Sequence, residues 1–161
     1  MQWKNPKIIS DITKLKSLVS SLRQENKSIV FTNGCFDIIH PGHIYILEQA
    51  KSKGDILIIG LNSDLSIKSF KSQNRPICPE TDRAYVLASL TCVDYIIIFN
   101  DDTPERLIIE ISPDVLVKGK DYQGKFIAGS EHMLANDKKI ELVDIITGKS
   151  TSNIIERIKK S

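Results

Sequence analysis

Short runs of consecutive hydrophobic residues alternate along the chain with stretches in which hydrophobic residues recur every three or four positions. Continuous apolar runs are typical of strands covered on both faces, and the wider spacing is typical of amphipathic helices. The runs predict strands at 29–32, 56–61, 95–99, 114–117 and 140–146. The spaced stretches predict helices at 12–22, 44–51, 80–90, 105–112, 130–136 and 151–160.

Strands that alternate with helices predict βαβ units with right-handed crossovers. The expected fold class is therefore α/β, a Rossmann-like doubly wound parallel sheet of about five strands with helices on both faces. No repeat or linker interrupts the pattern, so we expect one domain over 1–161, with a helical extension over 1–28 and a core over 29–158. Ligands of such sheets bind at the carboxyl ends of the strands. The segments to search are 32–43, 62–64, 99–103, 118–122 and 147–152.

Composition and charge exclude several classes of protein. The 161 residues are 41% hydrophobic and 26% charged, as in ordinary globular domains that bury a core. Lys plus Arg minus Asp plus Glu is 22 − 20 = +2, which gives no sign of the basic face of a nucleic-acid binder. Stretches without charge reach only ten residues, as at 84–93, and a membrane span needs about 18. With no signal-peptide pattern at the start, we expect a soluble, cytoplasmic protein without nucleic-acid or membrane partners.

The three cysteines Cys35, Cys78 and Cys92 are odd in number and far apart. They lack the C-x-x-C spacing of zinc sites and redox motifs. We therefore expect three reduced thiols.

An unusual cluster follows the first predicted strand, where His40 and His43 flank Pro41-Gly42 at the entrance to a helix. Pro41 suits the first helical turn, and Gly42 allows a ligand to approach the backbone closely. The free N–H groups of a first helical turn bind phosphate well, and both histidines can donate hydrogen bonds to the same phosphate. The alternative is a pair of loop histidines satisfied by the protein itself.

A second glycine-containing turn, Gly148-Lys149-Ser150, is similar to the end of a phosphate-binding P-loop. The full motif requires a glycine five residues earlier, where Val143 stands. The chain also lacks G-x-G-x-x-G, so neither a P-loop enzyme nor a dinucleotide dehydrogenase is supported.

The segment Thr32–His43 resembles the "TNGCFDxxHxGH" opening of nucleotidyltransferases with an H-x-G-H signature, the cytidylyltransferase-like group. Other blocks follow in that family's order, over nearly the whole of 29–158: Gly60–Asp64, Lys71 with Arg75-Pro76-Ile77, Asp82-Arg83-Ala84, Val117–Tyr122 and Ser150–Ser152. The most similar subgroup is the D-glycero-β-D-manno-heptose 1-phosphate adenylyltransferases, which make ADP-heptose for the lipopolysaccharide core. That subgroup occurs as stand-alone proteins and as the second domain of bifunctional kinase–adenylyltransferases, and these residues contain no kinase domain.

The resemblance implies transfer of AMP from ATP to a sugar 1-phosphate, with release of pyrophosphate. It implies catalytic roles for His40, His43, Lys71 (from a mobile 62–79 loop) and Arg83 (from helix 80–90). The nucleotide-binding residues that it implies are Thr32, Asn33, Gly34, Cys35, Phe36, Gly42, Lys118, Gly119, Ser150, Thr151 and Ser152. The sugar phosphate would be bound by Asp37, Lys118 and Asp121. Mg²⁺ is expected on the triphosphate, held by phosphate and water rather than by protein ligands.

Several of these residues have a purely structural alternative. Asp37 can fix its own loop by accepting hydrogen bonds from backbone N–H groups. Arg83 can pair with Glu80 or Asp82 on its own helix, and Ser150 can cap the last helix.

The sequence leaves both the substrate and the oligomeric state open. Lys149 and Asn153 depart from the family pattern around the last helix, and 121–126 is similar to a loop of glycerol-3-phosphate cytidylyltransferases. The alternative reaction therefore uses CTP and glycerol 3-phosphate or a similar alcohol phosphate. A further alternative is a nucleotide-binding regulatory module without turnover. Dimers are common in the family, so a homodimer is open, with the helix before Ile29 as one candidate contact.

Overall fold

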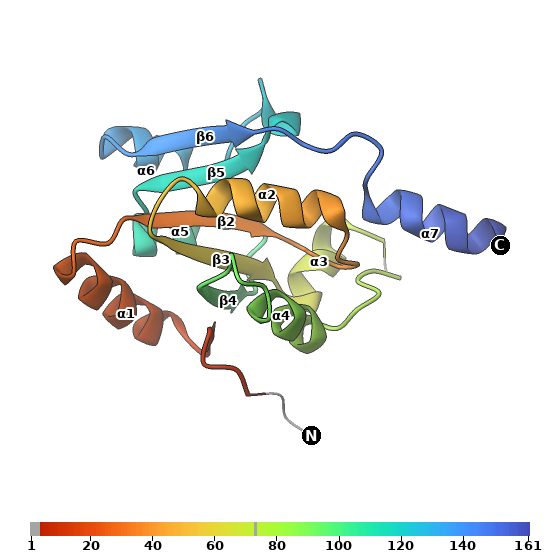
Figure 1. Ribbon diagram of the computed structural model, residues 1–161, viewed down its shortest axis with the longest axis horizontal. Coiled ribbons are helices and arrows are strands. Elements are labelled where there is room, and N and C mark those ends of the chain that lie inside the picture. Colours follow the sequence, from red (N-terminus) through yellow and green to blue (C-terminus); the bar gives the residue numbers. More distant parts are fainter. Residues whose placement is uncertain (1–3, 73) are drawn as a thin grey trace.

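The computed structural model describes residues 4–72 and 74–161 (Figure 1). Across these residues one six-stranded sheet runs in the order β1-β4-β3-β2-β5-β6, and all neighbouring strands are parallel. The strands are β1 (Ile8–Ile9), β2 (Ile29–Gly34), β3 (Ile56–Asn62), β4 (Tyr95–Phe99), β5 (Val115–Gly119) and β6 (Lys139–Val143). The helices are α1 (Ile12–Gln24), α2 (Pro41–Lys51), α3 (Asp64–Phe70), α4 (Glu80–Ala88), α5 (Glu105–Ile111), α6 (Ser130–Ala135) and α7 (Thr151–Lys160), with a 3-10 helix η1 (Lys120–Tyr122).

The predicted α/β fold is confirmed, with six strands instead of about five. The additional strand, β1, is only two residues long and pairs Ile8 with Ile96 at the edge of the sheet. A strand this short leaves no periodic pattern in a sequence. The order of strands reverses between β2 and β5, so ligands are expected at the carboxyl ends of these two strands.

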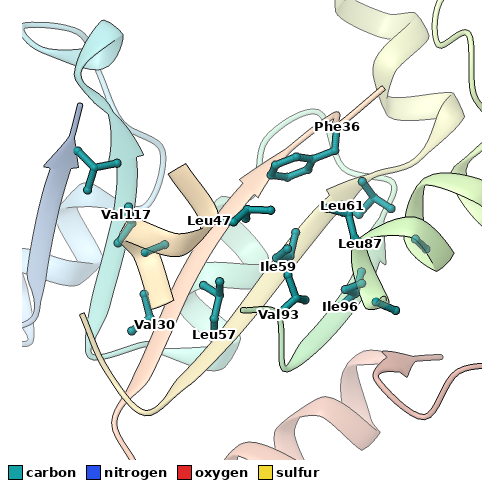
Figure 2. Close-up of a cluster of buried hydrophobic side chains, with 14 of the residues drawn as sticks. Val30, Phe36, Leu47, Leu57, Ile59, Leu61, Leu87, Val93, Ile96 and Val117 are labelled. Atoms are coloured by element: carbon teal, nitrogen blue, oxygen red, sulfur yellow. The ribbon is translucent and has the colours of Figure 1, made fainter. Parts of the chain in front are cut away.

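Two hydrophobic layers enclose the sheet, because side chains alternate between its faces along each strand. Val30, Leu57 and Ile59 lie on the face that α2 and α4 cover (Figure 2). Phe31 and Ile58 lie on the opposite face, which packs against α1, α5 and α6. This two-sided burial explains why the strands are continuous apolar runs rather than alternating ones.

Two predicted boundaries move for reasons that concern the site. Helix α2 begins at Pro41 rather than at 44, because His40 caps it. Strand β6 ends at Val143 rather than at 146, and Ile145 and Ile146 are partly exposed beyond it.

Helix α7 extends away from the sheet (Figure 1). None of its residues is buried. Within the described residues, no helix is both long and apolar enough to cross a membrane.

Candidate active site

Two cavities open side by side at the carboxyl ends of the strands. The first, of about 510 Å³, is lined by the segment after β2, the ends of β3 and β5, and Asp102–Pro104. The second, of about 350 Å³, lies at the start of α2 and the start of α7. His43, Lys71 and Thr151 line both cavities and mark the boundary between them.

The two motif histidines form a stacked pair at the start of α2, with ring centroids 3.8 Å apart and an interplanar angle of 26°. Nδ1 of His40 accepts the backbone N–H of Gly42 at 3.1 Å, which caps the helix. This bond requires the proton of a neutral His40 on Nε2, where it can be donated to a ligand. A Cβ on Gly42 would lie 2.9 Å from His40 Cε1, so the glycine makes room for the folded-back ring.

His43 is held more tightly than His40. Its ring lies against Phe36, with 5.2 Å between centroids, and its buried Nδ1 has no hydrogen-bond partner among the described residues. Burial, reinforced by the positive charges of His40 and Lys71, lowers the pKa of His43 to about 4. His43 is therefore neutral at pH 7, and the residue lies at the boundary between the cavities.

The predicted nucleotide-binding segment after β2 lies at the first cavity, where Asn33, Gly34, Cys35 and Phe36 all contribute to the wall. Thr32 does not, because its hydroxyl donates to the carbonyl of Val117 at 3.0 Å and ties β2 to β5. Its contact with nucleotide stays a prediction, and in the structure its hydroxyl serves the sheet.

Lys118, at the end of β5, is a buried cation of the first cavity. Only 6% of the residue is exposed, and burial lowers the pKa of its amine to about 8. The amine donates to Oδ1 of Asn33 and lies 5.1 Å from the centroid of the Tyr122 ring. These contacts leave part of its hydrogen-bonding capacity for a ligand.

Arg83, predicted to support phosphate binding, donates its hydrogen bonds to the protein itself. Its side chain is fully buried, and it donates to the carbonyls of Cys78 and Asn62 at 2.9 Å, to the carbonyl of Cys35, and to Asp64 at 2.7 Å. Neither direct phosphate binding nor the alternative pairing on its own helix describes these contacts. Arg83 ties together three segments, at Cys35, at Asn62–Asp64 and at Cys78.

Asp37, predicted as a ligand of the sugar phosphate, lines the first cavity and accepts hydrogen bonds from the protein. The residue is 3% exposed, and its carboxylate accepts from Arg75 Nε at 2.6 Å and from the backbone N–H groups of Ile77 and Cys78 at 2.8 and 2.9 Å. Burial opposes ionisation, but these hydrogen bonds and the charge of Arg75 prevail and hold the pKa of Asp37 below its usual value. These hydrogen bonds are of the kind that the structural alternative describes, and the segment that Asp37 fixes is 75–78.

Lys71 is the C-terminal cap of α3, which occupies much of the segment predicted as a loop. Its position on both cavities agrees with the predicted contact to phosphate. Arg75 lines the second cavity and had no predicted role, although it stands in the Arg75-Pro76-Ile77 block of the resemblance.

The start of α7 brings hydroxyl groups to the second cavity. Ser150 accepts the N–H of Asn153 at 3.1 Å as the helix cap, and Thr151 and Ser152 line the cavity beside it. Asp121 faces this second cavity, whereas Lys118 faces the first. Of the three residues predicted for the sugar phosphate, Asp37 and Lys118 thus share the first cavity and Asp121 lies at the second.

Gly119 provides space for Asp121. A Cβ on the glycine would lie 2.5 Å from Asp121 Oδ1. Among the described residues there is no group of three or more His, Cys, Asp or Glu side chains arranged to hold a metal ion.

At the switch point of a parallel sheet, a stacked histidine pair and several cations lie beside two helix starts. One helix start offers backbone amide groups and the other offers hydroxyl groups. This arrangement defines a nucleotidyltransferase-type domain. The chain belongs to the cytidylyltransferase-like family, whose model matches residues 31–157.

The chain is also similar to curated proteins over nearly its whole length. It is 50% identical over 151 residues to the bifunctional protein HldE of a Nitratiruptor species, covering 94% of this chain and 32% of that protein. It is 52% identical over 157 residues to HldE of Helicobacter pylori (strain Shi470), covering 98% of this chain and 32% of the relative. The chain thus spans about a third of the length of these relatives.

Among solved structures, a lipopolysaccharide core biosynthesis protein from Thermoplasma volcanium GSS1 matches 76% of this chain and 99% of its own, at 26% identity and a TM-score of 0.61. A pantoate-β-alanine ligase from Francisella tularensis matches 90% of this chain and 68% of its own, at 18% identity and a TM-score of 0.57. The second likeness concerns the fold alone.

Proposed function

We propose that this chain transfers AMP from ATP to a sugar 1-phosphate, D-glycero-β-D-manno-heptose 1-phosphate, and produces ADP-heptose for lipopolysaccharide core synthesis. The observation that carries the proposal is the pair of adjacent cavities that meet at His43, Lys71 and Thr151. A transfer between two substrates needs both to be held side by side with the migrating group between them. The similarity to HldE proteins and to the lipopolysaccharide core biosynthesis protein supports this substrate class.

The linings of the cavities favour one arrangement of the two substrates. The second cavity joins Lys71, Lys149 and the hydroxyls of Ser150–Ser152 at a helix start, which suits the polyphosphate of ATP. The first cavity offers Lys118 and Asn33 as donors, with aromatic rings around them, which suits a sugar in place of the nucleotide that the sequence predicts for Asn33–Phe36. Its phosphate would then face the boundary residues, where the α-phosphate of ATP also lies.

The reaction is an in-line displacement. An oxygen of the sugar phosphate forms a bond to the α-phosphorus while the bond from that phosphorus to the β-phosphate bridge breaks, and pyrophosphate leaves with the electron pair. His40 Nε2–H and His43 are placed to donate to oxygens of the transferring group, and Lys71 neutralises its charge. Mg²⁺, bound to the phosphates and water, would supply further neutralisation of the triphosphate.

Pyrophosphate release, measured with ATP or CTP against a panel of phosphates, tests the proposal. We expect turnover with ATP and heptose 1-phosphate. Turnover only with CTP and glycerol 3-phosphate would contradict the substrate assignment, and nucleotide binding without any release would favour a regulatory module.

A pair of histidine variants tests the chemistry of the site. We expect His43→Ala to abolish pyrophosphate release and to leave the fold largely intact, as judged by circular dichroism. His132→Ala is the matched control, because His132 lies on α6 and contacts Ser112 away from both cavities. Unchanged turnover in the His43 variant would refute the role of the histidine pair.

A further inference from the structure

Arg75 presents unused hydrogen-bond donors at the second cavity. Its side chain is 14% exposed, and Nε donates to Asp37 Oδ2 at 2.6 Å. Among residues 4–72 and 74–161, its terminal nitrogens have no hydrogen-bond partner. A guanidinium carries five N–H donors in a planar fork, so the edge that Asp37 does not use remains available.

Buried groups determine the direction in which this fork points. Asp37 accepts from Arg75 and from the backbone N–H groups of Ile77 and Cys78, so one carboxylate holds both the side chain and the backbone that follows it. On the other side, Arg83 donates to the carbonyl of Cys78 at 2.9 Å. The segment that carries Arg75 is therefore anchored from two directions, and its orientation does not depend on a ligand.

The surroundings of Arg75 attract anions. Lys71, Lys149 and Arg75 all line the second cavity, where burial and then the charge of Lys149 lower the pKa of His40. Among the residues that line this cavity, Asp121 is the only carboxylate. The cations therefore outnumber the acids, and an anionic ligand would relieve their mutual repulsion.

We propose that Arg75 binds the polyphosphate chain of the triphosphate substrate and that Asp37 is the residue that positions it. This inference rests on the proposed function, because it takes the second cavity as the place of the triphosphate. Arginine suits the role, since its fork can bind two phosphate oxygens at once. Lysine would supply the charge without the planar fork that matches two phosphate oxygens.

The direct test uses inorganic tripolyphosphate as the probe and isothermal titration calorimetry as the measurement, with the full chain. Loss of charge-assisted hydrogen bonds should weaken binding about 10-fold or more in Arg75→Gln and less in Arg75→Lys. The matched control is Arg106→Gln, because Arg106 is 69% exposed, pairs with Asp101 at 3.8 Å and does not line the second cavity. We expect the control to bind as the wild type does.

Steady-state kinetics separate binding of anions from a purely structural role. In Arg75→Gln and in Asp37→Asn, which keeps the arginine but weakens its anchor, KM for ATP should rise while KM for the sugar phosphate stays the same. A lower melting temperature with an unchanged tripolyphosphate Kd in Arg75→Gln would overturn the proposal. So would a wild-type protein that does not bind tripolyphosphate.

The two hypotheses fail in distinguishable ways. Arg75-dependent binding of tripolyphosphate without any nucleotidyl transfer would refute the proposed function and leave the anion site in place. Normal transfer in Arg75→Gln, with wild-type KM for ATP, would refute the role of Arg75 alone.

Discussion

Replacement of Lys118 by methionine should make the protein more stable at neutral pH and a poorer catalyst. Lys118 is 6% exposed, and burial lowers the pKa of its amine from 10.5 to about 8. The folded state therefore binds this proton less tightly than the unfolded chain does. The associated stability is present above pH 10.5 and is lost as the pH falls through 8, so the charged amine destabilises the fold at pH 7.

The size of the effect follows from the shift. A change of one pKa unit corresponds to about 1.4 kcal/mol, so the charged amine costs about 3 kcal/mol at pH 7. The variant also loses the hydrogen bond from the amine to Asn33, worth about 1 kcal/mol. Methionine keeps an unbranched stem of similar length, so we expect a net gain of about 2 kcal/mol in the free energy of unfolding.

Urea denaturation at pH 7.0 and pH 9.5 measures this difference. Between these pH values the wild type should gain about 2 kcal/mol relative to Lys118→Met, because Lys118 loses part of its charge in the fold. Lys120→Met is the matched control: its amine is exposed and pairs with Asp144 at 2.6 Å, which raises its pKa, so the control should not gain stability.

Two results would refute the reasoning. Lys118→Met could prove less stable than the wild type at pH 7, or both proteins could respond equally to the rise in pH. Either result would mean that the charged, buried amine does not destabilise the folded state. An unchanged KM for the sugar phosphate in this variant would separately contradict the assignment of Lys118 to that substrate.

Three other substitutions test other parts of the site. Because the pKa of His43 is lowered to about 4, the stability that it contributes is lost as the pH falls from 6.5 through 4. At pH 5 the free energy of unfolding of the wild type should therefore fall by about 2 kcal/mol relative to His43→Asn, as measured by urea denaturation. Arg83→Met should lower the free energy of unfolding by about 3 kcal/mol or more, because it leaves Asp64 and three carbonyls without their donor. A melting temperature within error of the wild type would contradict this. Ser150→Ala should lose about 1 kcal/mol of helix capping and raise KM for ATP, whereas a changed KM for the sugar phosphate alone would place Ser150 at the wrong substrate.

Hydrophobic pattern alone predicted most of the fold, because strands buried on both faces must be continuous apolar runs. Strand β1 was missed since Ile8 and Ile9 acquire their strand conformation only by pairing with Ile96 and Ile97 of β4. Such an edge strand depends on tertiary contacts and leaves no local signal.

The site was predictable where its geometry is local. His40 and His43 lie one turn apart at the start of α2, so their spacing in the sequence already places them together. Arg83 and Asp37 show the opposite case, because their partners lie up to 48 residues away in the chain. Residue type and motif placed both of them near the site, but only the packing of separate segments decides whether they face the ligand or the protein.

Helix α7 should unfold locally more easily than the central sheet does. Thr151 meets the body of the protein through a 3.4 Å hydrogen bond to the carbonyl of Ile38, while no residue of the helix is buried. Opening of such a segment costs far less free energy than unfolding of the sheet. The amides of α7 should therefore exchange their hydrogens long before those of β2 and β3, and a bound triphosphate should slow that exchange selectively.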